Sequence, residues 1–163
     1  MRRYKTGIGQ DSHRFLEKKT DKKCTIAALT FDDAPGLSAD SDGDVVLHAI
    51  CNAITSVSHV PILGKVAIEL CRDKGITNST VYLEKALETL GSHKIEHVAL
   101  TIEAKRPKLQ KRSDEMRKRI ASLMGLEIDQ VGMTFTSGDE LSDFGRGEGL
   151  MCFCVVTVYQ EDQ

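Results

Sequence analysis

The sequence predicts an α+β fold in which helices pack on one face of a mixed β-sheet. The chain has 163 residues, of which 40% are hydrophobic and 28% charged. These values are ordinary for one globular domain, so residues 1–163 are expected to form a single unit. Strand-like and helix-like segments follow one another roughly in the order ββααβαββ. Strands and helices in this order are typical of helices layered on a sheet.

The first half of the chain is expected to hold two strands followed by two helices. The strands are predicted at residues 4–10 and 25–31, and a loop with proline and glycine follows the second one. Each helix has apolar residues at helical spacing and a polar residue suited to cap its start. The helices are predicted to begin at Ser41 or Asp42 and at Asn78 or Ser79, the second ending near Gly91.

The second half adds three strands and one charged helix. Strands are predicted at residues 97–103, 131–136 and 150–159, and a helix at 113–124 that ends at Gly125. A polar, glycine-rich loop is expected at 137–149. With the helices on one face, the other face of the sheet needs a cover, and an oligomer is the simplest one.

Composition excludes several classes of function. The net charge of −2 gives no reason to expect nucleic acid as a partner, and no apolar run is long enough to cross a membrane. No signal peptide is recognised at the N-terminus. The five cysteines include no CxxC pair, and we interpret them as reduced, mostly buried thiols of a cytoplasmic protein.

Two acidic clusters near the start contain histidine and suggest a metal site. Asp11 and His13 lie two residues apart, so on a strand they point to the same face. His48 follows one helical turn after Asp44. One carboxylate and two imidazoles are the ligands of a catalytic zinc that keeps an open position.

The same residues also have simpler interpretations. A single histidine on a helix is usually structural, and the acids near residue 42 are commonly helix caps. If His48 does bind metal, the residues one turn away, Asp44 or Asn52, are candidates to orient its ring. The other histidines have no partner pattern and are interpreted as structural or solvated; they are His59, His93 and His97.

Three blocks taken in order resemble the 2-C-methyl-D-erythritol 2,4-cyclodiphosphate synthases of the non-mevalonate isoprenoid pathway. They are Asp11-Ser12-His13, the stretch from Ser41-Asp42-Gly43-Asp44 to His48, and Gly145-Arg146-Gly147-Glu148-Gly149. A weaker block is Ala104-Lys105-Arg106-Pro107-Lys108-Leu109. Because the blocks keep the family's order and similar separations, the resemblance covers nearly the whole chain.

The resemblance implies a homotrimer with active sites between subunits. It implies a lyase that converts 4-diphosphocytidyl-2-C-methyl-D-erythritol 2-phosphate to 2-C-methyl-D-erythritol 2,4-cyclodiphosphate and CMP. It assigns one zinc ion per subunit to Asp11, His13 and His48, and Mg²⁺ or Mn²⁺ to the diphosphate near Asp139. An isoprenoid phosphate is an expected ligand of the trimer's centre, near Arg146 and Glu148, which equally fit an interface ion pair.

The resemblance also assigns the remaining site residues. Asp40 and Ser137 take the positions of catalytic groups. Substrate binding falls to Ser41, Gly64, Ala104, Pro107, Lys108, Leu109, Thr136, Asp139, Asp143 and Arg146. Within this set, residues 104–109 and 136–139 correspond to the cytidine pocket.

Three positions depart from the family pattern. Asp40 stands where the family has histidine, Ile62 where it has an acid, and Ser137-Gly138-Asp139 where it has Thr-Thr-Glu. The loss of the acid at Ile62 suggests that an erythritol contact is lost or moved to Asn52. These departures motivate an alternative, a catalytically weakened trimer that only binds cytidine nucleotide or isoprenoid phosphate. A zinc hydrolase fits the metal ligands alone, but no general base accompanies them.

Overall fold

A four-stranded mixed sheet is the main sheet of the molecule. The computed structural model describes residues 1–18 and 20–161, so the expected unit 1–163 includes three residues outside the described part. The sheet has the order β1–β6–β4–β5, in which β6 is antiparallel to β1 and β4, and β4 is parallel to β5. Its strands are β1 (Arg2–Arg14), β4 (Lys94–Glu103), β5 (Val131–Thr136) and β6 (Gly149–Glu161). The predicted mixed sheet is confirmed.

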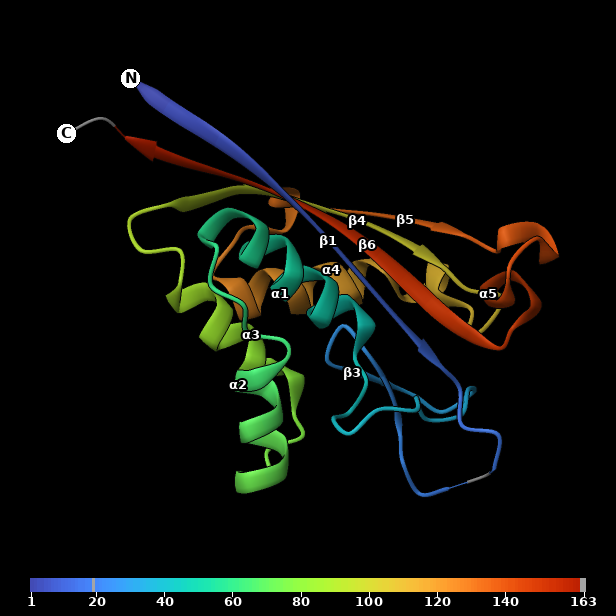
Figure 1. Cartoon of the computed structure of the whole chain (residues 1–163). Coiled ribbons are helices and arrows are strands. Elements are labelled where there is room, and N and C mark those ends of the chain that lie inside the picture. The colour runs from blue at the N-terminus through green and yellow to red at the C-terminus, as the bar shows by residue number, and fades with distance from the viewer. Residues whose placement is uncertain (19, 162–163) are drawn as a thin grey trace.

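The main helices cover one face of this sheet, as predicted (Figure 1). They are α1 (Val45–Ser58), α3 (Ser79–Glu88) and α4 (Ser113–Met124). Alternate strand residues point toward them and are buried, including Val98, Leu100 and Ile102 on β4. The helices and the inner sheet face thereby share one hydrophobic core.

The segment predicted as one strand at 25–31 is instead a hairpin. It consists of β2 (Cys24–Ile26) and β3 (Leu29–Phe31), which pair antiparallel outside the main sheet. The turn residues Ala27 and Ala28 have φ of 53° and 56°, a conformation that alanine adopts rarely. The sequence prediction was wrong because nothing in two alanines indicates such a turn.

The helix boundaries differ from the prediction at two places. Asp44, not Ser41 or Asp42, caps α1, and its side chain accepts hydrogen bonds from the backbone of Val46 and Leu47. α3 has the predicted cap at Asn78, but it ends at Glu88, before the expected stop at Gly91. α4 has the predicted bounds and ends at Gly125, which has a φ of 66°.

Several short helical segments were not predicted. α2 (Lys65–Ile68) continues as a π-helix at Glu69–Asp73, and the loop 137–149 contains a 3₁₀ turn at Gly138–Glu140 and α5 (Asp143–Arg146). Two more 3₁₀ turns lie at Leu109–Arg112 and Ile128–Gln130. These segments are too short to show a helical period in the sequence. Gly64, which was assigned to substrate binding, directly precedes α2, and Asp139 lies within the 3₁₀ turn of the loop.

The outer face of the sheet carries apolar side chains without a cover in the single chain. The side chain of Ile8 on β1 is 61% exposed, and that of Phe153 on β6 is 40% exposed. Ile8 lies opposite Val155, and Phe153 lies opposite Thr101, so these residues form neighbouring rows. The predicted open face is therefore present. In the described part of the chain, no helix is long and apolar enough to cross a membrane.

The five cysteines are free thiols, and all but Cys71 are buried. Cys152 and Cys154 share the inner face of β6, as their spacing predicted. Burial raises the pKa of both thiols. These cysteines are core residues and not nucleophiles.

Candidate metal centre and nucleotide pocket

Asp11, His13 and His48 meet at one point between β1 and α1. Asp11 Oδ2 lies 3.1 Å from His13 Nε2 and 3.1 Å from His48 Nδ1. The two ring nitrogens are 3.4 Å apart. Among the described residues these three side chains form the one group whose donor atoms are arranged to hold a metal ion. The structure therefore brings the predicted ligands together from residues far apart in the chain.

The spacing of these donors fits zinc. With metal–ligand bonds of about 2.0–2.1 Å, two ligands of a tetrahedral zinc lie about 3.3–3.4 Å apart. The three donor–donor distances of 3.1, 3.1 and 3.4 Å approach this value. A zinc ion held by these three residues would keep a fourth position for another ligand.

The carboxyl group of Asp11 is held in its charged form. Burial opposes ionisation, but hydrogen bonds with His13 and His48 outweigh it and lower the pKa of Asp11. An ionised carboxylate is the form that binds a divalent cation. The site is thus prepared for metal at neutral pH.

Two features of the fold place His48 against β1. Gly9 faces α1, and a β-carbon there would lie 2.8 Å from the carbonyl carbon of Asn52, so only glycine permits this approach. Asp44, at the start of α1, also accepts hydrogen bonds from the backbone of Ala27 and Ala28. Complete burial raises the pKa of Asp44 to about 6, although the hydrogen bonds from the backbone oppose this rise.

The predicted partners of the His48 ring are wrong. Asp44 is fully engaged by backbone N–H groups, and Asn52 donates to the carbonyl oxygen of Gln10. The second ring nitrogen, Nε2, lies instead 2.8 Å from the hydroxyl of Ser79. Spacing within one helix could not find this partner because Ser79 comes from α3.

Asp40 and Ser41 lie on the loop before α1, and Ser41 approaches His48. The hydroxyl oxygen of Ser41 is 3.5 Å from His48 Nε2. Lys22 donates to the carbonyl oxygens of Ala39 and Ser41 at 2.7 and 2.6 Å and so holds this loop. Burial lowers the pKa of Lys22.

Asp40 has a partner that the sequence analysis missed. Its carboxylate lies 3.1 Å from a guanidinium nitrogen of Arg72, and the thiol of Cys71 donates to its carbonyl oxygen at 3.2 Å. Arg72 belongs to the π-helix that was not predicted. Both side chains of the ion pair are largely exposed, at 69% for Asp40 and 65% for Arg72.

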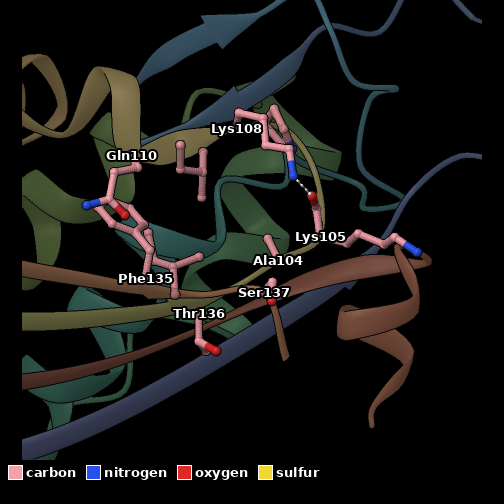
Figure 2. A pocket seen from close by; sticks show the side chains of 10 residues that line it. Ala104, Lys105, Lys108, Gln110, Phe135, Thr136 and Ser137 are labelled. Carbon is pink, nitrogen blue, oxygen red and sulfur yellow. Dashed lines mark hydrogen bonds between the residues drawn. The ribbon is translucent and has the colours of Figure 1, made fainter. Parts of the chain in front are cut away.

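A second site lies at the ends of β4 and β5 and brings together the residues predicted for cytidine. The hollow has a volume of about 160 Å³. Figure 2 shows the side chains that line it, from the turn after β4 and the end of β5. Predicted residues in its lining are Ala104, Pro107, Lys108, Leu109, Thr136 and Ser137. Lys105, Gln110 and Phe135 also line it and were not singled out.

The groups in this hollow suit a flat polar ligand. Phe135 and Leu109 supply apolar walls, and Thr136 and Ser137 supply hydroxyls. The ammonium of Lys108 lies 3.4 Å from the carbonyl oxygen of Lys105, as the dashed line in Figure 2 marks. None of the lining residues belongs to the metal triad, so within one chain the two sites are separate.

The chain matches known proteins over almost its full length. The pattern of the YgbB family covers residues 4–159. The 2-C-methyl-D-erythritol 2,4-cyclodiphosphate synthase of Chlamydia caviae is 54% identical over 156 residues, which are 95% of this chain and 89% of the relative. The chain belongs to the YgbB family of 2-C-methyl-D-erythritol 2,4-cyclodiphosphate synthases. The resemblance found in the sequence is confirmed.

Solved structures of this synthase family share the fold. One 2C-methyl-D-erythritol-2,4-cyclodiphosphate synthase superposes with a TM-score of 0.80 at 26% identity, covering 94% of this chain and 99% of that one. A form of the synthase bound to CDP gives a TM-score of 0.77 at 27% identity, with the same coverage. The α+β architecture is therefore that of the family.

The glycine-rich block of the YgbB family holds a cluster of charges beside His13. Arg14 pairs with Glu148 at 2.5 Å and lies 3.9 Å from Asp143, which also pairs with Arg146. A cavity of about 230 Å³ is lined by His13 together with Arg14, Asp143 and Glu148. Arg146 thus has a carboxylate partner in its own chain, and Arg14 is an additional cation that the sequence analysis did not name.

The remaining predicted residues lie in three surroundings. Ile62 is 4% exposed and packs in the core, which explains an apolar residue where the family has an acid. Asn52, proposed as its replacement, is bonded to the backbone of β1. Gly64 is exposed with a φ of 107°. Asp139 is exposed with a φ of 45°, and its carboxylate accepts from the hydroxyl of Ser137 at 3.2 Å.

Proposed function

We propose that the chain is a phosphorus–oxygen lyase that makes 2-C-methyl-D-erythritol 2,4-cyclodiphosphate in the non-mevalonate isoprenoid pathway. The substrate is 4-diphosphocytidyl-2-C-methyl-D-erythritol 2-phosphate. Its 2-phosphate oxygen forms a bond to the β-phosphorus, and the bond from that phosphorus to the oxygen of CMP breaks. CMP leaves with the electron pair, and no water is consumed.

The converging donors of Asp11, His13 and His48 are the observation that carries this proposal. Zinc bound there supplies a Lewis acid that neutralises phosphate charge and aligns the reacting groups. The chain contributes the ionised carboxylate of Asp11 and leaves the fourth corner open to a substrate phosphate. Phosphoryl transfer needs mainly alignment and charge neutralisation, and these residues provide both.

The hollow between β4 and β5 is proposed to bind the cytidine. Lys108 would reach phosphate, and the hydroxyls of Thr136 and Ser137 would contact the nucleotide. Asp139, which lies outside the lining of the hollow but is bonded to Ser137, is proposed to help to hold Mg²⁺ or Mn²⁺ on the diphosphate. A structure of the synthase bound to CDP supports a cytidine nucleotide as ligand of this fold. Gly64 is proposed to let the backbone approach the erythritol.

Assembly as a homotrimer is proposed to complete the active site. The apolar rows around Ile8 and Phe153 need a cover, and a second and third copy supply it. Because the metal triad and the nucleotide hollow are separate within one chain, a substrate that spans both fits a site between neighbouring subunits. Arg146 and Glu148 would then lie near the trimer's centre, where an isoprenoid phosphate is the proposed ligand. We further propose a cytoplasmic location and one domain, residues 1–163.

CMP release measured together with metal content tests the proposed reaction. The purified protein should hold one zinc per chain and release CMP from the diphosphocytidyl substrate when Mg²⁺ or Mn²⁺ is added. His48→Ala should remove zinc and CMP release together, whereas His93→Ala, which changes a histidine bonded to the carbonyl of Leu90, should keep both. A zinc-loaded protein that releases no CMP would reject the proposal.

The ion pair of Asp40 and Arg72 favours one alternative, a catalytically weakened trimer that binds cytidine nucleotide or isoprenoid phosphate. An ionised carboxylate that accepts from arginine cannot donate a hydrogen bond to phosphate, as histidine does. CMP binding by calorimetry with no turnover of the substrate would favour this alternative.

A further inference from the structure

Two successive residues beside the nucleotide hollow have a backbone conformation that residues with a side chain rarely adopt. Asp139 and Glu140 have φ of 45° and 62°, in the left-handed region. They follow Ser137, which lines the hollow and whose hydroxyl donates to the carboxylate of Asp139 at 3.2 Å. Backbone in such a conformation persists only where surrounding contacts hold it. The contacts of the turn Gly138–Glu140 therefore bear on where the hydroxyl of Ser137 lies.

Glu103 at the end of β4 and Lys105 just after it both contact this turn. A β-carbon on Gly138 would overlap the carboxylate of Glu103, so the backbone of the turn packs directly on that side chain. At the other end of the turn, Lys105 donates to the carboxylate of Glu140 at 2.6 Å, and Arg146 donates to its backbone carbonyl at 3.2 Å. In the described part of the chain, Lys105 is the one partner of the Glu140 carboxylate.

Lys105 lines the hollow, but its charge is directed to the turn. Figure 2 shows its ammonium extending away from the side chains of Gln110 and Phe135. The hydrogen bond with Lys105 lowers the pKa of the Glu140 carboxyl, which therefore stays ionised at neutral pH. The ammonium of Lys105 is thus engaged by a charged partner outside the hollow.

We propose that Lys105 is a positioning residue that, by pairing with Glu140, holds the turn Gly138–Glu140 and so keeps the hydroxyl of Ser137 at the rim of the nucleotide hollow. The proposal rests on the proposed nucleotide site and adds to it a residue that the sequence analysis did not single out. Both side chains are exposed, at 47% and 69%, and exposed ion pairs are weak. The expected loss of nucleoside affinity without the pair is therefore modest, about 2–5-fold.

Titrations with cytidine, followed by NMR, test this role. Cytidine is the probe because it carries no phosphate, so its affinity does not respond to a lost phosphate contact. Lys105→Gln and Glu140→Gln each break the ion pair, and each should weaken cytidine binding about 2–5-fold. The double variant with exchanged charges, Lys105→Glu with Glu140→Lys, should restore the affinity of the wild type. Lys85→Gln is the matched control, because it breaks a similarly exposed pair with Glu88 on α3 and should leave cytidine binding unchanged.

CDP separates this role from a direct contact between Lys105 and phosphate. If Lys105 bound phosphate itself, Glu140→Gln would release its ammonium and strengthen CDP binding without changing cytidine binding. The double variant with exchanged charges would then place a carboxylate beside the phosphates and lose CDP binding. This pattern would overturn the proposal, and so would cytidine affinities equal to the wild type in both single variants.

Backbone NMR shifts show whether the turn itself responds. The ¹³C shifts of Asp139 and Glu140 report φ, and they should lose their left-handed signature in Lys105→Gln and Glu140→Gln but keep it in Lys85→Gln. If the wild type binds neither cytidine nor CDP, the nucleotide site of the proposed function fails, and the role of Lys105 fails with it. If the wild type binds cytidine and releases CMP while both variants keep their shifts and affinities, only the role of Lys105 fails.

Discussion

Gly9 on β1 and Ala49 on α1 meet backbone to backbone, and this contact sets the distance between the two elements that carry the metal ligands. A β-carbon on Gly9 would overlap the carbonyl oxygen of Ala49. Asp11 and His13 lie two and four residues farther along the same strand, and His48 precedes Ala49. The separation of strand and helix therefore also sets the geometry of the metal site.

Gly9→Ala should weaken both the fold and the metal site. Inserting a methyl group into a packed contact commonly costs about 1–3 kcal/mol. For a domain of this size that lowers the melting temperature by roughly 3–10 °C. Pushing α1 away from β1 also moves His48 away from Asp11, so zinc affinity should fall. Gly9→Val should lower the melting temperature and the zinc affinity further than Gly9→Ala does. If Gly9→Ala has the melting temperature and zinc affinity of the wild type, the contact between β1 and α1 is not tight.

The strand period predicted that Asp11 and His13 share one face, and the family resemblance added His48 to the same candidate metal site. The partners around them could not be predicted. Ser79 reaches His48 from another helix, and Arg72 reaches Asp40 from a π-helix with no sequence period. Such contacts depend on how distant elements pack, which no local pattern encodes.

The predicted ends of helices and strands also depend on whether the stabilising groups are local in the sequence. The helix at 113–124 was predicted with its correct ends, because its charged face and Gly125 are local signals. The hairpin at Ala27 and Ala28 was missed, because its left-handed turn is held by the distant carboxylate of Asp44. The sequence predicts elements well where the stabilising groups are adjacent, and less well where they are remote.

Asp40 and Arg72 should act as one unit in catalysis. Because the two side chains pair at 3.1 Å, removing either one leaves the other without this partner. Asp40→Ala and Arg72→Ala are expected to lower kcat by similar factors, and the double variant should be no worse than either single one. Steady-state CMP release at saturating substrate gives kcat for the two single variants and the double variant.

Stability should change little in these variants, since exposed ion pairs contribute about 0–1 kcal/mol. Lys74→Ala, on an exposed neighbouring residue, is the control and should leave kcat unchanged. Effects of Asp40→Ala and Arg72→Ala that multiply in the double variant would mean that the residues act separately.

Asp40→His should preserve or raise activity if the carboxylate is only a poor substitute for the family's histidine. A large loss of activity would show that the pairing with Arg72 matters.

Phe153→Glu should separate the proposed trimer into monomers. The aromatic ring lies on the outer face of β6 beside Thr101, and a carboxylate buried there between copies would lack a partner. Light scattering coupled to gel filtration should give the mass of a trimer for the wild type and of a monomer for the variant. Lys118→Glu, on the exposed side of α4, should remain trimeric. A wild-type mass of one chain would refute the assembly.

The buried carboxyl group of Asp44 should make stability depend on pH in the metal-free protein. Its pKa is raised to about 6 in the fold and is about 3.9 in the unfolded chain, so between these values the folded state binds the extra proton. The free energy of unfolding should therefore fall as pH rises from 4 to 7, by about 2–3 kcal/mol from this group.

Asp44→Asn removes the titrating group and isolates this effect. The variant should be less stable at every pH, because an amide cannot accept from all four backbone N–H groups that surround Asp44. The difference in unfolding free energy between wild type and variant should be largest near pH 4 and shrink through pH 6. Urea denaturation in the presence of a chelator measures it, and parallel pH curves for the two proteins would show that Asp44 has the same pKa in both states.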